Sequence, residues 1–465
     1  MRYDAAKPTR QFPPRGSGTE NVLEALPAQT WVHPDGLGPH WDWKPGRVLL
    51  GKWNNRFIGR DDDRHIVTLA GSRAGKTSTS LIPNLLRYPG SCLVLDPKGE
   101  LARATAQARV RMGHAVFVCD PFGVSGLPTA SYNPFSSLDG TDPRYLGADV
   151  AQAVDAIIIN NAKDPHWTDG GKNLLRGAAL HLIQTTGKVP TLRQLRRLIS
   201  ASEDDLQKLF TAMSKSQVEA VANTGASFKG KLDLGPRELQ SILSTVQEQT
   251  APFDDVAHVT ERSDFKLTDL KNGKMTIYLV LPGLRMGTHY RWLRLIIQQA
   301  LAAMERAPVP YGQLPVWFVL EEFPTLGHMQ SIEKAAGLLA GYGVKLWSVL
   351  QDLTQLQTHY QKSWETFLGN AGILQAFGNA DTTTTEYLSK RLGMTQVIER
   401  QEVRVSGAAM AHGDLGRREN LRAVRLLEPN EITEWFARET GRQLIITSGG
   451  RPIYLERLDR ERSTS

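Results

Sequence analysis

Cysteine is scarce in this chain of 465 residues, which contains only Cys92 and Cys119. Each lies in an apolar, strand-like run, SCLVLD and AVFVCD. Two thiols in such surroundings favour buried, reduced side chains over a disulfide or a cysteine-ligated metal site. The cysteine content is therefore typical of a cytosolic protein.

Long hydrophobic runs are also missing. No stretch approaches the roughly 20 apolar residues that a membrane-spanning helix needs. The opening segment, MRYDAAKPTRQFPPRGSG, has no apolar centre, which excludes a signal peptide. We find no internal repeat and no low-complexity segment, and we expect a soluble protein.

Charge of one sign is only slightly in excess, since 55 Lys and Arg against 48 Asp and Glu give a formal net charge of +7. This excess suits an anionic partner but is spread too thinly to identify one. The 41% of hydrophobic residues can form a large core, and the length allows two or three structural units.

Alternating strand and helix patterns predict an α/β domain. GRVLLGKWNNRFIGR predicts a hairpin, and HIVTLA predicts a strand that ends before a glycine-containing loop. Further strands are expected at SCLVLD, HAVFVCD, KMTIYLVL, PVWFVL and VKLWSVL, with helices after the loop, over 100–112 and over 291–307. Strand-like pieces and a short helix, EPNEITEWFARE, follow from about residue 395.

Residues 141–262 have a different character, because every periodic segment in them predicts a helix. We therefore expect an arm over 1–45, an α/β nucleotide-binding domain formed by 46–140 and 263–465, and an inserted all-α domain over 141–262. The predicted sheet is predominantly parallel.

The segment TLAGSRAGKTST, residues 68–79, resembles a phosphate-binding loop, but Ala70 stands where the usual pattern has its first glycine. Gly71 can supply the flexible turn, and Gly75 lets the backbone curl. Lys76 offers a charge for the outer phosphates, and Thr77 offers a hydroxyl for Mg²⁺. The alternative is a strand-to-helix turn that binds nothing. The residues expected to bind nucleotide are Gly71, Ser72, Arg73, Ala74, Gly75, Lys76, Thr77 and Ser78.

Such a loop acts together with an acid at the end of a second buried strand. VWFVLEEF provides Glu321 and Glu322 after four apolar residues, 317–320. One carboxylate would associate with Mg²⁺ and the other would polarise the attacking water. Glutamate at position 321 is unusual, since aspartate is commoner there. Its carboxylate could contact the metal directly or through a water molecule.

Two other strand ends carry polar residues. Gln351 follows the strand 346–350 and could sense the γ-phosphate or orient water. Asp96, Lys98 and Glu100 follow SCLVL, where an ordinary polar turn that caps a helix is slightly favoured over a ligand site.

These pieces, in this order, resemble the type IV secretion system coupling proteins of the TraG/VirD type over roughly residues 47–455. The resemblance rests on a combination of segments, none of which is specific alone. They include GSRAGKTSTSLIPNLL, LVLDPKGEL, DPHWTDGGKNLLRGAALHLI, ELQSILSTVQ, FVLEEFPTLGHM, SVLQDLTQLQTHY, FGNADTTTTEYLSKRLG and GGRPIYLERL.

The resemblance implies a RecA-like P-loop ATPase domain with an inserted all-α domain, and hexameric rings that use ATP and Mg²⁺. It assigns Lys76 and Thr77 to ATP and Mg²⁺, and Glu321 to the metal-associated acid. Glu322 becomes the catalytic acid, and Gln351 becomes the motif glutamine. The family's loops often begin with a small residue other than glycine, so Ala70 is compatible with activity.

The implied function is an ATP-hydrolysing translocase that recruits and pumps single- or double-stranded DNA toward a type IV secretion channel during conjugative transfer. Relaxase or effector proteins would bind the all-α domain. Two alternatives stay open: a free cytosolic DNA translocase of the FtsK/HerA type, and a nucleotide-binding adaptor that does not hydrolyse ATP.

Two departures from the family matter. Its members usually begin with transmembrane helices, and this chain has none. We therefore expect the anchorless, cytoplasmic form, recruited to the inner membrane's cytoplasmic face, rather than a cytosolic piece of an anchored protein. Glu321 in place of aspartate bears on metal affinity and turnover.

Two sets of residues stay open. The arginine that acts in trans is Arg294 or Arg391, and the cations that face the pore are Lys229 and Lys231, or Arg193, Arg196 and Arg197.

Overall fold

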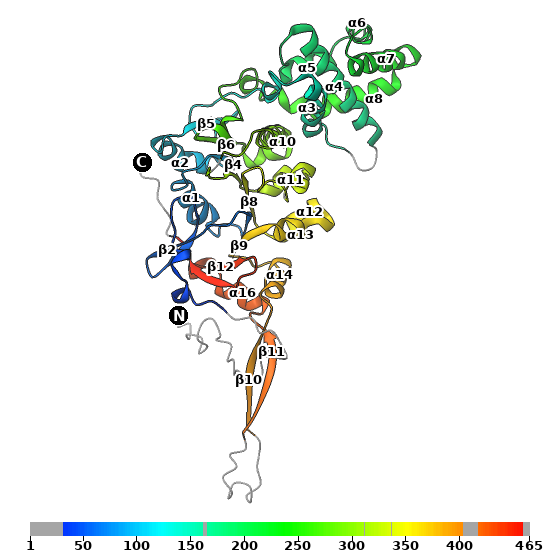
Figure 1. The fold of residues 1–465 in the computed structure, drawn as a ribbon. Coiled ribbons are helices and arrows are strands. Elements are labelled where there is room, and N and C mark those ends of the chain that lie inside the picture. The colour runs from blue at the N-terminus through cyan, green and yellow to red at the C-terminus, as the bar shows by residue number, and fades with distance from the viewer. Residues whose placement is uncertain (1–30, 161–164, 311, 336, 403–416, 459–465) are drawn as a thin grey trace, which may run out of the picture. The chain divides into compact units, whose positions relative to one another are not determined.

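The computed structural model describes residues 31–160, 165–310, 312–335, 337–402 and 417–458 (Figure 1). The chain forms two compact units. The first, which we call the loop unit, consists of Met1–Asn84 and Val349–Ser465; the second, the helical unit, is Leu85–Ser348.

The loop unit is built on a mixed sheet. The predicted hairpin and the strand after it are confirmed, and the strand next to the latter is β9, which the sequence patterns did not predict. Only β3 and β9 are parallel, so their carboxyl ends lie at one edge; the other neighbours are antiparallel. In spatial order the strands are β2 (Arg56–Arg60), β1 (Val48–Trp53), β13 (Ile453–Glu456), β12 (Arg442–Thr447), β9 (Ala371–Phe377) and β3 (His65–Ala70).

Capping side chains start several helices of this unit. The Asp352 carboxylate accepts a hydrogen bond from the Gln355 backbone N–H, and Asp381 does the same for Thr384. Short 3₁₀ turns Pro34–Gly36, Pro39–Trp41, Gln361–Ser363 and Arg438–Thr440 (η9) join the elements. The helices are η3 (Thr77–Leu81, a π-helical turn), α1 (Ile82–Leu85, which crosses into the helical unit), α12 (Leu353–Tyr360), α13 (Trp364–Gly369), α14 (Thr382–Leu392) and α16 (Pro429–Trp435).

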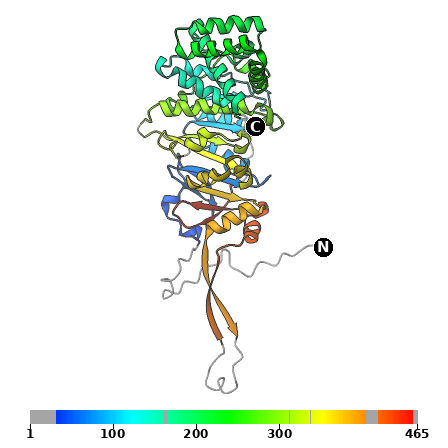
Figure 2. The ribbon, with the colours of Figure 1, turned by 90° about the vertical axis from the view of Figure 1, so that its right-hand side faces the viewer.

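A two-stranded ribbon leaves this unit after α14. β10 (Met394–Glu402) pairs with β11 (Arg417–Arg425) in antiparallel register from Met394 opposite Arg425 to Glu402 opposite Arg417. Figures 1 and 2 show the ribbon from two sides, extending away from α14 and α16. The sequence indicated strand character at 397–405, whereas its partner β11 was not predicted.

The helical unit has an all-parallel sheet, as the strand and helix alternation predicted. Its strands β4, β6, β7 and β8 are buried throughout and β5 only at its end, and helices α2 (Glu100–Arg111) and α10 (Gly283–Arg306) cross over between them. Since all strands run the same way, their carboxyl ends meet at one edge. In spatial order they are β8 (Val344–Leu350, whose last two residues belong to the loop unit), β7 (Val316–Leu320), β4 (Cys92–Asp96), β6 (Met275–Val280) and β5 (Ala115–Cys119).

The described residues between 141 and 262 form helices and turns and no strand, as predicted. Thr191 and Gln194 form a capping box at the start of one helix. Compactness groups this block with the strands of the helical unit, so the boundaries 141 and 262 stay a prediction. The helices are α3 (Pro143–Ile157), α4 (Pro165–Thr186), α5 (Leu192–Ile199), α6 (Glu203–Ser214), α7 (Glu219–Leu234) and α8 (Pro236–Thr250), followed by 3₁₀ turns Ala251–Phe253 and Ala257–Val259.

Shorter elements complete the helical unit: η4 (Pro134–Leu138), α9 (Asp269–Asn272), η7 (Phe323–Leu326) and α11 (Gln330–Ala335). Across the portion of the chain with described structure, no helix combines the length and apolarity required to cross a membrane.

Candidate functional site

The glycine-containing loop joins the carboxyl end of β3 to the helical turn η3, the context that the phosphate-loop prediction required. Arg73 and Gly75 have φ of +57° and +98°, so the backbone turns through left-handed conformations twice before Lys76. The Gly75 carbonyl then accepts hydrogen bonds from the Thr79 backbone N–H and hydroxyl, at 2.8 and 2.9 Å. Lys76 is largely buried at the start of the helical turn, and Ser72 and Arg73 are exposed.

Close backbone packing explains the glycine at position 71. A Cβ atom on Gly71 would lie 1.9 Å from the carbonyl oxygen of Gly378, which follows β9. Gly378 itself has φ of +64°, and a Cβ there would lie 2.6 Å from the Cβ of Ala74. The loop therefore lies directly on the segment after β9, and only glycine fits this approach.

Ala70 occupies a different environment from that of Gly71. It is the last residue of β3, is fully buried, and packs in a small cluster with Ala74 and Phe377. A small apolar side chain fits this place, while the turn itself begins at Gly71. The missing first glycine therefore leaves the conformation of the loop intact.

Arg457, to which sequence reasoning assigned no role, directly follows β13 and supports the loop. Its Nη1 donates to the carbonyl oxygen of Ala74, and its Nη2 donates to that of Arg438. The guanidinium lies 5.0 Å from the ring centroid of Phe377. Only the quoted segment GGRPIYLERL contained a signal for it. The buried guanidinium of Arg457 thus fixes the backbone of the loop at Ala74.

Gln351 follows β8 and lies in the loop unit with Lys76. Its backbone carbonyl accepts a hydrogen bond from Asn379 Nδ2 at 3.2 Å, and Asn379 directly follows Gly378. The segment after β9 therefore contacts both the phosphate loop and the residue predicted as the motif glutamine.

The acidic pair belongs to the helical unit, at the end of β7. Glu321 is buried, at 4% exposure, whereas Glu322 is partly exposed with a left-handed backbone, φ +54°. Left-handed backbone at a residue other than glycine is strained and is typical of functional positions. The Glu322 carbonyl accepts from the backbone N–H and hydroxyl of Thr325, at 2.9 and 2.7 Å, which holds the turn.

Asp96 ends β4, the strand beside β7. The register pairs Leu95 with Leu320, so Asp96 and Glu321 follow on neighbouring strands. Asp96 is fully buried, and its Oδ2 accepts from the Ala102 backbone N–H at 2.8 Å. Burial raises the pKa of this carboxyl group. The bond to Ala102 supports the expected role in capping the helix α2, while Lys98 and Glu100 are exposed.

The chain after Glu322 is fixed by Arg294 of α10. Its Nη1 donates to the carbonyl oxygens of Leu326 and His328, at 2.8 and 2.6 Å. Arg294 is 7% exposed. Arg294 is therefore bound within its own chain, whereas Arg391, the other arginine considered for a role in trans, is exposed.

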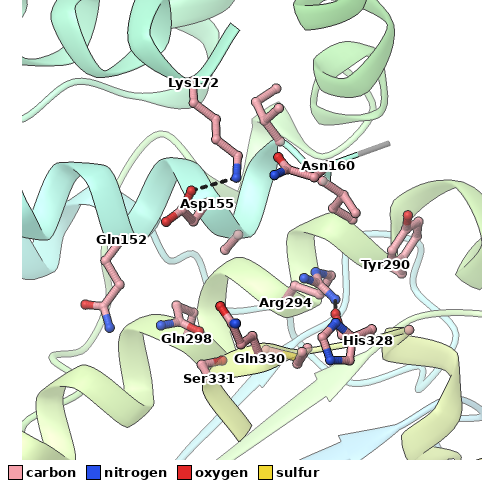
Figure 3. Close-up of a pocket in the computed structure, with 15 residues that line it drawn as sticks. Gln152, Asp155, Asn160, Lys172, Tyr290, Arg294, Gln298, His328, Gln330 and Ser331 are labelled. Carbon is pink, nitrogen blue, oxygen red and sulfur yellow. Dashed lines mark hydrogen bonds and ion pairs between the residues drawn. The ribbon is translucent and has the colours of Figure 1, made fainter. Parts of the chain in front are cut away.

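Arg294 and His328 also line a cavity of about 520 Å³ (Figure 3). Helix α3 contributes Gln152 and Asp155, and α4 contributes Lys172, whose Nζ lies 2.9 Å from the Asp155 carboxylate. The turn after the acidic pair therefore forms one wall of a polar cavity whose opposite wall is helical.

Most of the cations considered for a pore are paired with carboxylates. Lys229 lies 2.6 Å from Asp233 and Lys231 contacts Glu238; Arg193 and Arg196 lie 2.9 and 2.7 Å from Glu261 and Asp254. Arg197 is exposed. A carboxylate therefore offsets the charge of each of these four cations.

Comparison with known proteins identifies the family. Residues 27–459 match the model described as type IV secretory system conjugative DNA transfer. Protein VirD4 of Rhizobium radiobacter is 28% identical over 356 residues, which cover 75% of this chain and 51% of that protein. Conjugal transfer protein TraG of Escherichia coli is 27% identical over 410 residues, covering 82% and 62%. The chain thus spans about half the length of the VirD4 relatives it matches.

Solved structures agree at the level of the fold. Plasmid coupling protein TrwB, in complex with a non-hydrolysable ATP analogue, aligns with a TM-score of 0.67 and 17% identity, covering 94% of this chain and 95% of that one. Its complex with ADP and Mg²⁺ aligns equally well, with 94% of both chains covered. The fold is RecA-like α/β with helical additions, and the chain belongs to the type IV secretory system family of conjugative DNA transfer proteins.

Proposed function

We propose that this chain is an ATP-hydrolysing coupling protein that recruits DNA and moves it toward a type IV secretion channel. One observation carries the proposal: a loop that turns twice through left-handed backbone at Arg73 and Gly75 and presents Lys76 at the start of a helical turn. A phosphate chain fits such a loop, because backbone N–H groups and a lysine can surround it. Family membership and the nucleotide complexes of TrwB support it.

Each site residue then has a distinct part. Residues 71–76 wrap the phosphates, and the Lys76 ammonium balances the charge that develops as the outer phosphate departs. Thr77 and Ser78 add hydroxyls at the start of the helical turn. Glu322 accepts a proton from, or orients, the attacking water, and Gln351 positions that water against the γ-phosphate.

Mg²⁺ is the metal that this donor set fits. The Thr77 hydroxyl and the Glu321 carboxylate are the residues we assign to it, since Mg²⁺ prefers hard oxygen ligands. When bound, the ion neutralises phosphate charge. Glu321, whose side chain is 4% exposed, would hold the ion directly or through water.

The partners follow from the family. DNA would be contacted without sequence preference through its phosphates, so its binding would weaken as salt rises. Relaxase or effector proteins would contact the helices between 141 and 262. A homo-hexameric ring at the cytoplasmic face of the inner membrane is the assembly that suits this work.

Nucleotide titration with single variants tests the site. We expect Lys76→Ala to lower ATP affinity at least tenfold, because a charge-assisted phosphate contact is lost. Glu322→Gln should bind ATP normally but hydrolyse it at least a hundredfold more slowly. Lys362→Ala and Glu248→Gln, at exposed positions elsewhere, serve as matched controls. Equal ATP affinity in wild type and Lys76→Ala would contradict the proposal.

A further inference from the structure

A second cavity, of about 520 Å³, lies wholly within the loop unit. Its walls come from four places: the residue before the 3₁₀ turn Pro34–Gly36, the end of β1, the junction of η9 and β12, and the end of β13. Its volume falls within the range typical of small-molecule sites. The residues that line it are His33, Lys52, Trp53, Thr440, Gly441, Arg442, Tyr454, Glu456 and Arg457.

Arg457 joins this cavity to the phosphate loop. The side chain that lines the cavity is the same one whose Nη1 binds the Ala74 carbonyl. A Cβ on Gly75 would lie 3.8 Å from that nitrogen. The cavity and the loop are therefore neighbours that share one buried guanidinium.

The walls combine aromatic rings with cations. The Trp53 ring lies 5.4 Å from that of Tyr454 at an interplanar angle of 89°, and His33 lies 5.6 Å from Trp53. The Trp53 indole N–H donates to Asp35 at 2.7 Å, which fixes the ring. Lys52, Arg442 and Arg457 face a single lining carboxylate, Glu456. Such a wall suits a flat, electron-rich heterocycle attached to an anion.

We propose that this cavity receives the base of the nucleotide whose phosphates bind the loop. The inference rests on the proposed nucleotide binding at Lys76 and extends it from the phosphates to the base. Trp53 supplies the stacking surface, and the Thr440 hydroxyl and Glu456 carboxylate supply hydrogen-bonding groups at the edge of the ring. A strand of nucleic acid would need a row of such surfaces, whereas this cavity offers a single one beside the loop.

Titration of ATP and of base-free tripolyphosphate into the full chain separates the two parts of the site. We expect wild type to bind ATP at least tenfold more tightly than tripolyphosphate. Trp53→Leu should lower ATP affinity roughly tenfold, as loss of one stacking contact implies, and leave tripolyphosphate affinity unchanged. Lys76→Ala should weaken both. Trp364→Leu is the matched control, because Trp364 is a partly exposed tryptophan of the same unit that packs on Tyr387.

Photolabelling of wild type with 8-azido-ATP gives a second readout that does not depend on the folding of a variant. We expect labelled peptides to contain residues 52–53, 440–442 or 454–457. Labels confined to other peptides, or equal affinity of wild type for ATP and tripolyphosphate, would overturn the base site while leaving the phosphate loop in place. So would a Trp53→Leu variant that loses single-stranded DNA binding but keeps its ATP affinity. Failure of wild type to bind either ligand would overturn both proposals.

Discussion

At the scale of single residues, one buried arginine of the helical unit makes hydrogen bonds to several backbone carbonyls. Arg109 is fully buried on α2 and donates to the carbonyl oxygens of Leu85, Tyr88 and Gly90. It also reaches the Thr276 hydroxyl at 2.9 Å and the Nδ1 of His114 at 3.2 Å. Carbonyl oxygens in this number replace the hydration that the guanidinium loses on burial.

His114 beside Arg109 makes stability depend on pH. Burial, with a smaller effect from the charge of Arg109, lowers the pKa of His114 from 6.5 to about 4. The unfolded chain therefore binds one proton more than the folded chain between these values, so stability falls as pH drops from about 6.5 to about 4. We expect His114→Gln to remove about 2–3 kcal/mol of this pH dependence. Urea unfolding at pH 7.5 and at pH 4.5 measures it; an identical pH dependence in both proteins would contradict the assignment.

The contact of Gly71 with Gly378 predicts a large effect from one methyl group. Gly71→Ala should lower the free energy of unfolding by about 1–3 kcal/mol, because the added Cβ would overlap a backbone carbonyl that cannot move aside. Gly369→Ala is the control, since an added Cβ there meets nothing within 4 Å. Thermal unfolding, in the presence and in the absence of nucleotide, would measure the stability of both variants. Equal stabilities would show that the loop does not lie on the segment after β9.

At the scale of elements, the turn after β7 is held by α10, the helix that precedes β7 in the chain. Because Arg294 of α10 binds the carbonyls of Leu326 and His328, we propose that it positions Glu322. We expect Arg294→Met to lower kcat between tenfold and a hundredfold while the affinity for ATP stays unchanged, since a small displacement of a catalytic group is costly. Arg285→Met, an exposed arginine of the same helix that lies 4.4 Å over Phe122, is the control. A parallel fall in ATP affinity would instead indicate general unfolding.

The sequence predicted most elements but missed β9, and the reason is visible in its contacts. The strand AGILQAF carries Gln375 in its centre, which interrupts the apolar run. Gln375 is buried and accepts from the hydroxyls of Thr68 and Ser80, at 3.0 and 2.9 Å. These partners come from β3 and η3, so local patterns could not reveal that a glutamine belongs to a core strand. The ribbon partner β11 was missed because it is rich in arginine.

Local sequence patterns revealed some residues of the site and missed others that reach it from distant parts of the chain. The phosphate loop, the acidic strand end and Gln351 follow from residues adjacent in sequence, so motifs revealed them. Arg457 and Gly378 contact the phosphate loop and Asn379 contacts Gln351, all from the last hundred residues, and no local spacing connects these positions to residue 71. Tertiary contacts of this kind can be recognised only in the structure.

At the scale of the whole molecule, the domains expected from the order of the segments along the chain differ from the two compact units of the structure. The sequence predicts an all-α insertion over 141–262 inside one nucleotide-binding domain. The structure groups those helices with the parallel strands that carry Asp96 and Glu321, and places the phosphate loop and Gln351 in the other unit. Lys76 thus belongs to the loop unit and Glu322 to the helical unit.

ATP hydrolysis with and without DNA tests the central claim most directly. Wild type should hydrolyse ATP faster in the presence of single- or double-stranded DNA, and salt should weaken the stimulation because phosphate contacts mediate it. Both Lys76→Ala and Glu322→Gln should lose this turnover. Nucleotide binding without turnover, with any DNA, would contradict a motor and favour an adaptor that recruits substrate without hydrolysing ATP.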